Sequence, residues 1–288
     1  MKPSVAVSLK ILLALEDSPH YVSAVNMLTH IKWPPGTTVD LLAVMAGPLP
    51  LMDTTPENRQ YVDETAEIVR WRNWAATKIL IRHISTTLRA YRLAVKNTEV
   101  CEGQLIETAL EHASANLPDI VVIAAKTTDV PGKIWLNPAT QKLAQIAPQS
   151  VLVVRPSKQV CPLHTILAVD GSPEAWQAVE FMRSLSLPNW ARVTLLCLAG
   201  EQTGSTSTPA AASFADEAIS YMHDCGVAVK WLRRDGPPTR EILSVAHEEE
   251  ADLIVLGGKS QTSIKPSPQP GITRSLVKHA PCSVLVVR

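Results

Sequence analysis

The sequence predicts two α/β domains in tandem, each built on a doubly wound, five-stranded parallel sheet. Two observations lead to this fold class: the chain repeats itself, and short apolar segments alternate with helical segments in both copies. Near-continuous apolar runs are typical of strands covered on both faces, and strands that alternate with helices form right-handed crossovers in a parallel sheet. The length of 288 residues also suits two domains of about 150 residues each.

The repeat is clearest in the second half of each copy, where the copies align without a gap. Gly103 aligns with Gly236 at a spacing of 133 residues, whereas Ser18 near the start aligns with Ser172 at a spacing of 154. The first copy is therefore longer by the difference, 21 residues. The matched segments are ILLALEDSP at 11–19 with ILAVDGSP at 166–173, and VLVVR at 151–155 with VLVVR at 284–288.

The chain is expected to divide into a first domain at 1–155, a linker at 156–163 and a second domain at 164–288. The linker carries two prolines and no periodic pattern, which is typical of a connecting segment. We expect the closing VLVVR segments to pack against each other, because mutual contact hides two strand edges and makes the chain an internal pseudo-dimer. The expected strands are 11–15, 39–44, 93–100, 120–124 and 151–154, then 166–169, 193–198, 227–232, 253–257 and 284–287.

The extra residues of the first copy fall between its second and third strands, where they predict one long helix over about 56–91. Thr54 and Glu57 form a capping-box pattern, with Pro56 in the first turn. The apolar surface of this helix suits either a longer cover for the sheet or a docking face for a second subunit, as in a homodimer, or for another protein. Its apolar stripe is Val69, Ala76, Leu80, Ile84, Leu88 and Tyr91, widened by Trp71, Trp74 and Ile81.

Composition excludes several partner classes. The 27 basic and 27 acidic side chains cancel, so we expect neither nucleic acid nor an anionic membrane as a partner, because both attract proteins with a large positive field. The five cysteines are scattered and never form a C-x-x-C pair, which favours the cytoplasm and predicts no metal site. An apolar run near the start, interrupted by Lys10, is interpreted as the first strand, and no run reaches the roughly 18 apolar residues of a membrane span.

The candidate binding site lies in the second domain. In a doubly wound sheet, ligands bind outside the carboxyl ends of the strands, at the point where the strand order reverses. Asp170 follows the first strand of this domain. Gly257 is the last residue of the fourth strand, and Gly258 follows it. Gly271 and Thr273 open the last helix, whose free N–H groups and positive dipole can receive a phosphate. No residue is assigned a catalytic role.

At these residues the sequence resembles the universal stress proteins, and the resemblance covers both copies nearly end to end. It is carried by ILAVDGSP at 166–173 and HAPCSVLVVR at 279–288. The resemblance implies two flavodoxin-like domains, a role in stress response, and a small nucleotide of the ATP type as the ligand. The nucleotide-binding members carry Gly, two residues, Gly, nine residues, Gly, then Ser or Thr. The matching positions in the second domain are Gly258, Gln261, Gly271 and Ile272, so two of the four are kept.

The resemblance also implies roles for individual residues. Asp170 would contact the ribose, and the backbones of Gly258 and Gly271 would contact phosphate, with Thr273 replacing the hydroxyl that Ile272 lacks. Gln261 places a side chain where the family has bare backbone. In the alternative interpretation, Gly257 and Gly258 only ease the end of a strand, and Gly271 with Pro270 only turns the chain into a helix.

The first domain has lost more of the motif. Glu16 replaces the ribose-facing acid, and Pro138 at the mouth of the last helix lacks the N–H that would face a phosphate. We therefore expect no nucleotide in the first domain and one at most per chain. The positions that match the motif are Ala125, Thr128, Pro138 and Ala139.

Two enzymatic motifs are incomplete in the second domain. A phosphate-binding P-loop would need a glycine where Leu253 stands, and a nucleophile elbow would need one where Thr262 stands, so we expect no enzyme, or at most a weak ATPase. His112 and His247 are expected at the surface or rim of the third helix of each domain rather than as ligands. Two hypotheses remain: a nucleotide sensor in the second domain, or a module that binds proteins or another small ligand and has lost nucleotide in both domains.

Overall fold

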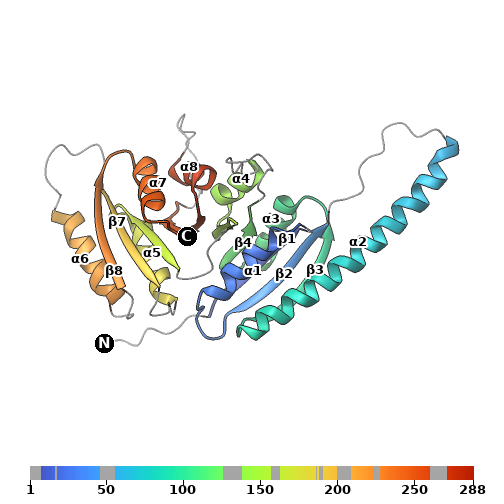
Figure 1. The fold of residues 1–288 in the computed structure, drawn as a ribbon, viewed down its shortest axis with the longest axis horizontal. Helices are drawn as coiled ribbons and strands as arrows, with labels where there is room; N and C mark the ends of the chain where they lie inside the picture. Colours follow the sequence, from blue (N-terminus) through green and yellow to red (C-terminus); the bar gives the residue numbers. More distant parts are fainter. Residues whose placement is uncertain are drawn as a thin grey trace.

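The computed structural model describes residues 8–16, 18–45, 56–125, 138–156, 163–185, 187, 191–199, 209–223, 228–259 and 271–288, and for 56–66, 199 and 209–213 it describes the backbone alone. Strands and helices alternate through both domains, as the repeat predicts (Figure 1). The first domain contains β1 (Lys10–Glu16), α1 (Tyr21–His30), β2 (Thr38–Met45), α2 (Pro56–Ala90), β3 (Ala94–Glu102), α3 (Leu105–Asn116), β4 (Ile120–Ala124), α4 (Pro138–Ile146) and β5 (Ser150–Val154). The second domain contains β6 (His164–Val169), α5 (Pro173–Ser184), β7 (Arg192–Ala199), α6 (Pro209–His223), β8 (Ala228–Asp235), α7 (Pro238–Glu248), β9 (Leu253–Gly257), α8 (Ile272–His279) and β10 (Ser283–Val287).

The ten strands form one continuous sheet in the order β3-β2-β1-β4-β5-β10-β9-β6-β7-β8. Within each domain neighbouring strands are parallel, and the order reverses between the first and fourth strands, which confirms the doubly wound fold. The closing strands β5 and β10 pair antiparallel, with Leu285 opposite Leu152. The expectation that the two VLVVR segments pack together is confirmed, and two sheet edges are removed by this pairing.

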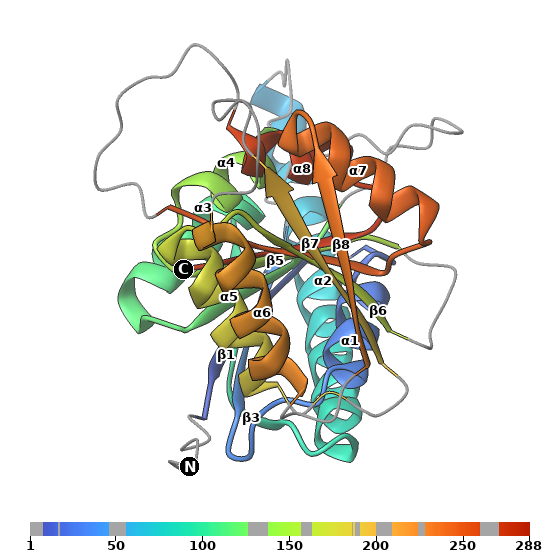
Figure 2. The ribbon, with the colours of Figure 1, turned by 90° about the vertical axis from the view of Figure 1, so that its left-hand side faces the viewer.

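The helices cover the sheet in two layers that run across both domains (Figure 2). The apolar faces of α1, α2, α5 and α6 share one core on one face of the sheet, and those of α3, α4, α7 and α8 share the other. Strands β3 and β8 lie at the two outer edges and expose most of their side chains, as edge strands commonly do. Each closing strand is completely buried, so the joint is part of the core.

Two arginines bind across the joint in equivalent ways. The Arg155 guanidinium, directly after β5, donates hydrogen bonds at 2.8 and 3.1 Å to two carbonyls in the last turn of α8. Arg288, which is 133 residues further on and follows β10, donates to the carbonyls of Ala144 and Gln145 at the end of α4, the latter at 3.2 Å. Because the last carbonyls of a helix have no partner within it, each arginine satisfies the helix end of the other domain.

The long helix α2 is present as expected, but its buried stripe differs from the expected one. Ile81, Ile84 and Leu88 are buried against the sheet, whereas Val69 and Tyr91 of the expected stripe are 40% and 59% exposed. In Figure 1 the N-terminal part of α2, which contains Val69, extends beyond the sheet, whereas Tyr91 directly follows the other end of the helix. The main contacts of α2 are with β2, β3 and α1 of its own domain. Thr54 of the expected capping box lies outside the described residues.

No helix in the described part of the chain is both long enough and apolar enough to cross a membrane. Helix α2 has the length, but exposed charged side chains are distributed along it.

Candidate functional site

The loop after β6 holds Asp170 at the carboxyl end of the strand. The Asp170 carboxylate accepts a hydrogen bond at 3.0 Å from the N–H of Ser172, which closes a tight turn. Gly171 between them has a φ of +80°, a backbone conformation that residues other than glycine rarely adopt. Ser172 then caps α5 by accepting the N–H of Ala175 at 3.2 Å, and Pro173 occupies the first turn. This local chemistry leaves Asp170 exposed at the strand end.

The glycines at the end of β9 are required by close packing. A Cβ on Gly257 would lie 2.1 Å from the carbonyl oxygen of Glu174 at the start of α5, and a Cβ on Gly258 would lie 2.4 Å from Cγ1 of Val286. Gly258 also donates its N–H to the Val287 carbonyl at 2.8 Å. These contacts agree with the interpretation in which both glycines ease the strand end.

Gly271 and the first turn of α8 form the third segment of the site. Gly271 precedes the helix with a φ of −57°, and within the described residues no side chain caps the helix. Among the described residues, a Cβ on Gly271 would meet nothing within 4 Å, so their packing gives no reason for a glycine at this position. Thr273 lies in the first turn that follows. The free N–H groups of this turn are therefore available to a ligand.

A cavity of about 400 Å³ brings these segments together. Asp170, Gly257, Gly271 and Thr273 all line it, at the place where the strand order reverses between β6 and β9. Gly258 is not on its wall, and Gln261 lies outside the described residues. The apolar part of the wall includes Ala168, Val169, Leu198, Ile242, Leu256 and Ile272.

The cavity wall carries charges of both signs. Glu174 lies there with Asp170, and Lys259 and Arg288 supply two cations. Burial lowers the pKa of Arg288, whose guanidinium is held by carbonyls of the first domain. Gln145 of α4 also lines the cavity, so the first domain contributes to it. Sequence reasoning missed these four residues: the repeat of VLVVR was a signal for Arg288, but nothing in the sequence pointed to Gln145.

The matching region of the first domain differs in residue type but keeps one backbone hydrogen bond, because Ala125 stands where Gly258 stands in the second domain and donates to the equivalent carbonyl. Ala125 is completely buried and donates its N–H to the Val154 carbonyl at 2.7 Å. Pro138 opens α4, and Glu16 ends β1 at the place of Asp170. Thr128 lies outside the described residues. The absence of nucleotide from this domain stays a prediction.

Comparison with known proteins identifies the family. The model of the universal stress protein family matches residues 9–155 and again 163–288. The chain belongs to the universal stress protein family. It carries two such domains in tandem, which confirms the resemblance seen in the sequence.

Individual relatives agree with this assignment. A Staphylococcus aureus (strain USA300) protein named for the same family is 29% identical over 136 residues, which are 43% of this chain and 82% of that protein. The crystal structure of a universal stress protein from Archaeoglobus fulgidus matches with a TM-score of 0.67 at 14% identity, over 97% of this chain and 98% of that one. A functionally unknown protein from Pseudomonas aeruginosa PAO1 matches with a TM-score of 0.55 at 14% identity, over 98% of this chain and 93% of that one. At such identities these two structures show the fold alone.

Proposed function

We propose that the second domain of this tandem universal stress protein binds one small nucleotide of the ATP type per chain. The observation that carries the proposal is that Asp170, Gly257, Gly271 and Thr273, from three separate segments, line a single cavity. A volume of about 400 Å³ is in the range of small-molecule sites, roughly 300–1,000 Å³. The position at the carboxyl ends of β6 and β9 is where doubly wound sheets bind ligands.

Each side of the cavity suits one part of a nucleotide. The exposed Asp170 carboxylate accepts hydrogen bonds from ribose hydroxyls, as the family resemblance implies. The N–H groups at the start of α8 donate to phosphate, and the open space at Gly271 allows the close approach that they need. Thr273 supplies a hydroxyl and Lys259 a positive charge. Gly258 supports the end of β9 from outside the wall.

The binding is expected to be weaker than in family members that keep the whole motif. Ile272 supplies no hydroxyl, and Gln261 carries a side chain where the motif has glycine. The loss of one or two charge-assisted hydrogen bonds of about 1.5–3 kcal/mol each corresponds to a loss of roughly 10- to 10⁴-fold in affinity.

A second candidate function is favoured by one specific observation. Glu174 lies on the cavity wall together with Asp170, and two carboxylates repel an anionic phosphate, whereas much of the wall is apolar. In this alternative the cavity holds a small ligand without phosphate, or the protein acts through contacts with other proteins.

The cellular setting that we propose is the cytoplasm, with a role in stress response and at most slow ATP hydrolysis. The cysteines support this setting, because Cys101, Cys197 and Cys282 are free thiols and the other two lie outside the described residues.

Calorimetric titration of the full chain with ATP tests the proposal. We expect a stoichiometry near one, a loss of about 10- to 100-fold in affinity in Asp170→Ala, and a further loss in Gly271→Pro, which removes an N–H at a φ that proline accepts. Asp216→Ala, an exposed carboxylate on α6, is the matched control and should bind as the wild type does. A stoichiometry near two, or unchanged binding in both site variants, would reject the assignment. No detectable heat of binding with ATP, together with another ligand retained by the purified protein in mass spectrometry, would favour the alternative.

A further inference from the structure

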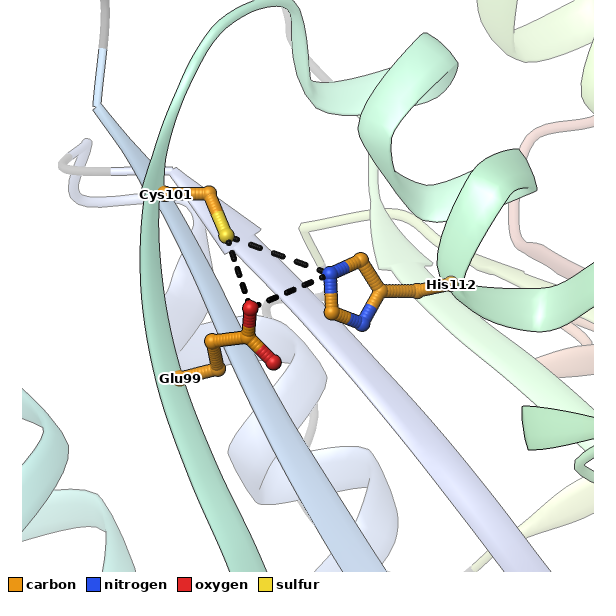
Figure 3. Close-up of side chains that lie close together, drawn as sticks. All are labelled: Glu99, Cys101 and His112. Atoms are coloured by element: carbon orange, nitrogen blue, oxygen red, sulfur yellow. Dashed lines mark hydrogen bonds and ion pairs between the residues drawn. The ribbon is translucent and has the colours of Figure 1, made fainter. Parts of the chain in front are cut away.

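A second group of polar side chains lies in the first domain, on β3 and α3 (Figure 3). Glu99 and Cys101 are two residues apart on β3 and therefore point to the same face of the strand, and His112 of α3 points toward them. The Cys101 thiol donates to Glu99 Oε1 at 3.3 Å, His112 Nε2 lies 3.5 Å from the same oxygen, and Cys101 Sγ lies 3.9 Å from His112 Nε2. Sulfur, nitrogen and oxygen donors thus converge on one point.

The three distances are close to the edges of a tetrahedral zinc site. Zinc binds cysteine sulfur at about 2.3 Å, histidine nitrogen at about 2.0–2.1 Å and carboxylate oxygen at about 2.0–2.2 Å, which places tetrahedral donors about 3.3–3.6 Å apart. The observed separations of 3.3, 3.5 and 3.9 Å allow an ion between the donors after only a small shift of side chains. We propose that Glu99, Cys101 and His112 bind one Zn²⁺ ion, with water as the fourth ligand.

The donor set selects this class of ion. A thiolate and an imidazole suit zinc and similar transition metals, whereas magnesium and calcium require oxygen ligands. The cluster is accessible from solvent, because the Glu99 side chain is 57% exposed and the His112 side chain is 20% exposed. An ion can therefore reach the cluster from solvent beside the edge strand β3.

A proton occupies the sulfur when no ion is bound. Burial, together with the hydrogen bond to Glu99 and its charge, raises the pKa of Cys101 to about 11. A thiol of this kind is a poor nucleophile at neutral pH, which disfavours a role as a reactive cysteine. A metal ion reverses the balance, since it binds the thiolate and releases the proton to solvent.

The second domain offers an internal comparison. At the spacing of 133 residues, its matching positions are Leu232, Arg234 and Val245, none of which is a zinc ligand. The proposed site therefore belongs to the first domain alone, which lacks the glycines of the nucleotide motif. The sequence predicted no metal site because its cysteines form no C-x-x-C pair and His112 was expected at the surface.

Zinc titration of the full chain, stripped with a chelator and competed against a chromophoric indicator, measures the site directly. We expect one Zn²⁺ per chain, and a loss of at least about 100-fold in affinity in both Cys101→Ser and His112→Asn, because each removes a direct ligand. Cys197→Ser and His247→Asn change the same residue types in the second domain and should leave zinc binding unchanged.

Cobalt substitution gives a second readout, and its wild-type spectrum does not depend on the folding of a variant. Co²⁺ bound to the wild-type chain should show a thiolate-to-cobalt charge-transfer band, and Cys101→Ser should lack it. A wild-type complex without this band, zinc binding that survives Cys101→Ser, or an equal loss in Cys197→Ser would overturn the proposal. Weak adsorption of several ions per chain, as at surface histidines, would overturn it as well.

Discussion

Replacement of Arg155 by methionine should destabilise the protein by about 2–5 kcal/mol. The Arg155 side chain is 2% exposed and donates to the carbonyls of Val277 at 2.8 Å and Lys278 at 3.1 Å, across the joint between the domains. Methionine keeps the apolar contacts of the side chain but leaves both carbonyls without this donor. Each buried polar group left unpaired costs about 1–3 kcal/mol, and relief from burying a cation offsets part of the sum.

Urea unfolding followed by circular dichroism measures this loss. Arg155→Lys keeps the charge but cannot form the same pair of hydrogen bonds, so its loss should lie between those of the wild type and the methionine variant. Arg240→Ala, at an exposed position on α7, is the control and should change stability by less than about 0.5 kcal/mol. A loss in Arg155→Met no larger than this control would refute the argument that the arginine holds the joint.

Three further predictions follow from other parts of the structure. Gly257→Ala should cost at least about 2 kcal/mol in urea unfolding, because its Cβ would lie 2.1 Å from a carbonyl oxygen, whereas Gly271→Ala should stay within about 1 kcal/mol of the wild type; equal losses would contradict this. Burial raises the pKa of Cys282 from 9.0 to about 12, so its contribution to stability is complete below pH 9 and is lost by up to about 1.4 kcal/mol per pH unit as the pH rises toward 12; Cys282→Ala should flatten this slope, and an unchanged slope would count against it. The Trp71 side chain is 71% exposed on α2. If α2 forms an interface between chains, sedimentation should show a dimer that Trp71→Lys dissociates, and a monomer at all concentrations would contradict this interface.

The sequence predicted the fold well because the pattern of each strand is local and occurs in both copies of the repeat. Each strand is a short apolar run, and the second copy confirms the register of the first, so the pairing of VLVVR with VLVVR could be expected before the structure was known. The same logic located the cavity, since Asp170 and Gly257 follow from the rule that ligands bind where the strand order reverses.

Features that depend on distances between elements could not be predicted in this way. The apolar periodicity predicted that α2 is a helix, but it did not predict where the sheet beneath the helix ends. Val69 was therefore expected to be buried, although it is exposed. The approach of His112 to Cys101 depends on how α3 lies over β3, and Gln145 reaches the cavity only because the two domains share one sheet. Spacing along the chain carries no signal for any of these contacts.

Because the two halves joined at β5 and β10 belong to one chain, they are free from the symmetry of a dimer of identical chains. In a dimer of identical chains every substitution occurs twice, so a pocket cannot disappear on one side and persist on the other. A single covalent chain has no such restriction. Glu16 stands in one half where Asp170 stands in the other, and Cys101 and His112 of the first half are replaced by other residue types at the matching positions of the second. Each half can therefore specialise for a different ligand, while the shared sheet keeps both at a fixed separation.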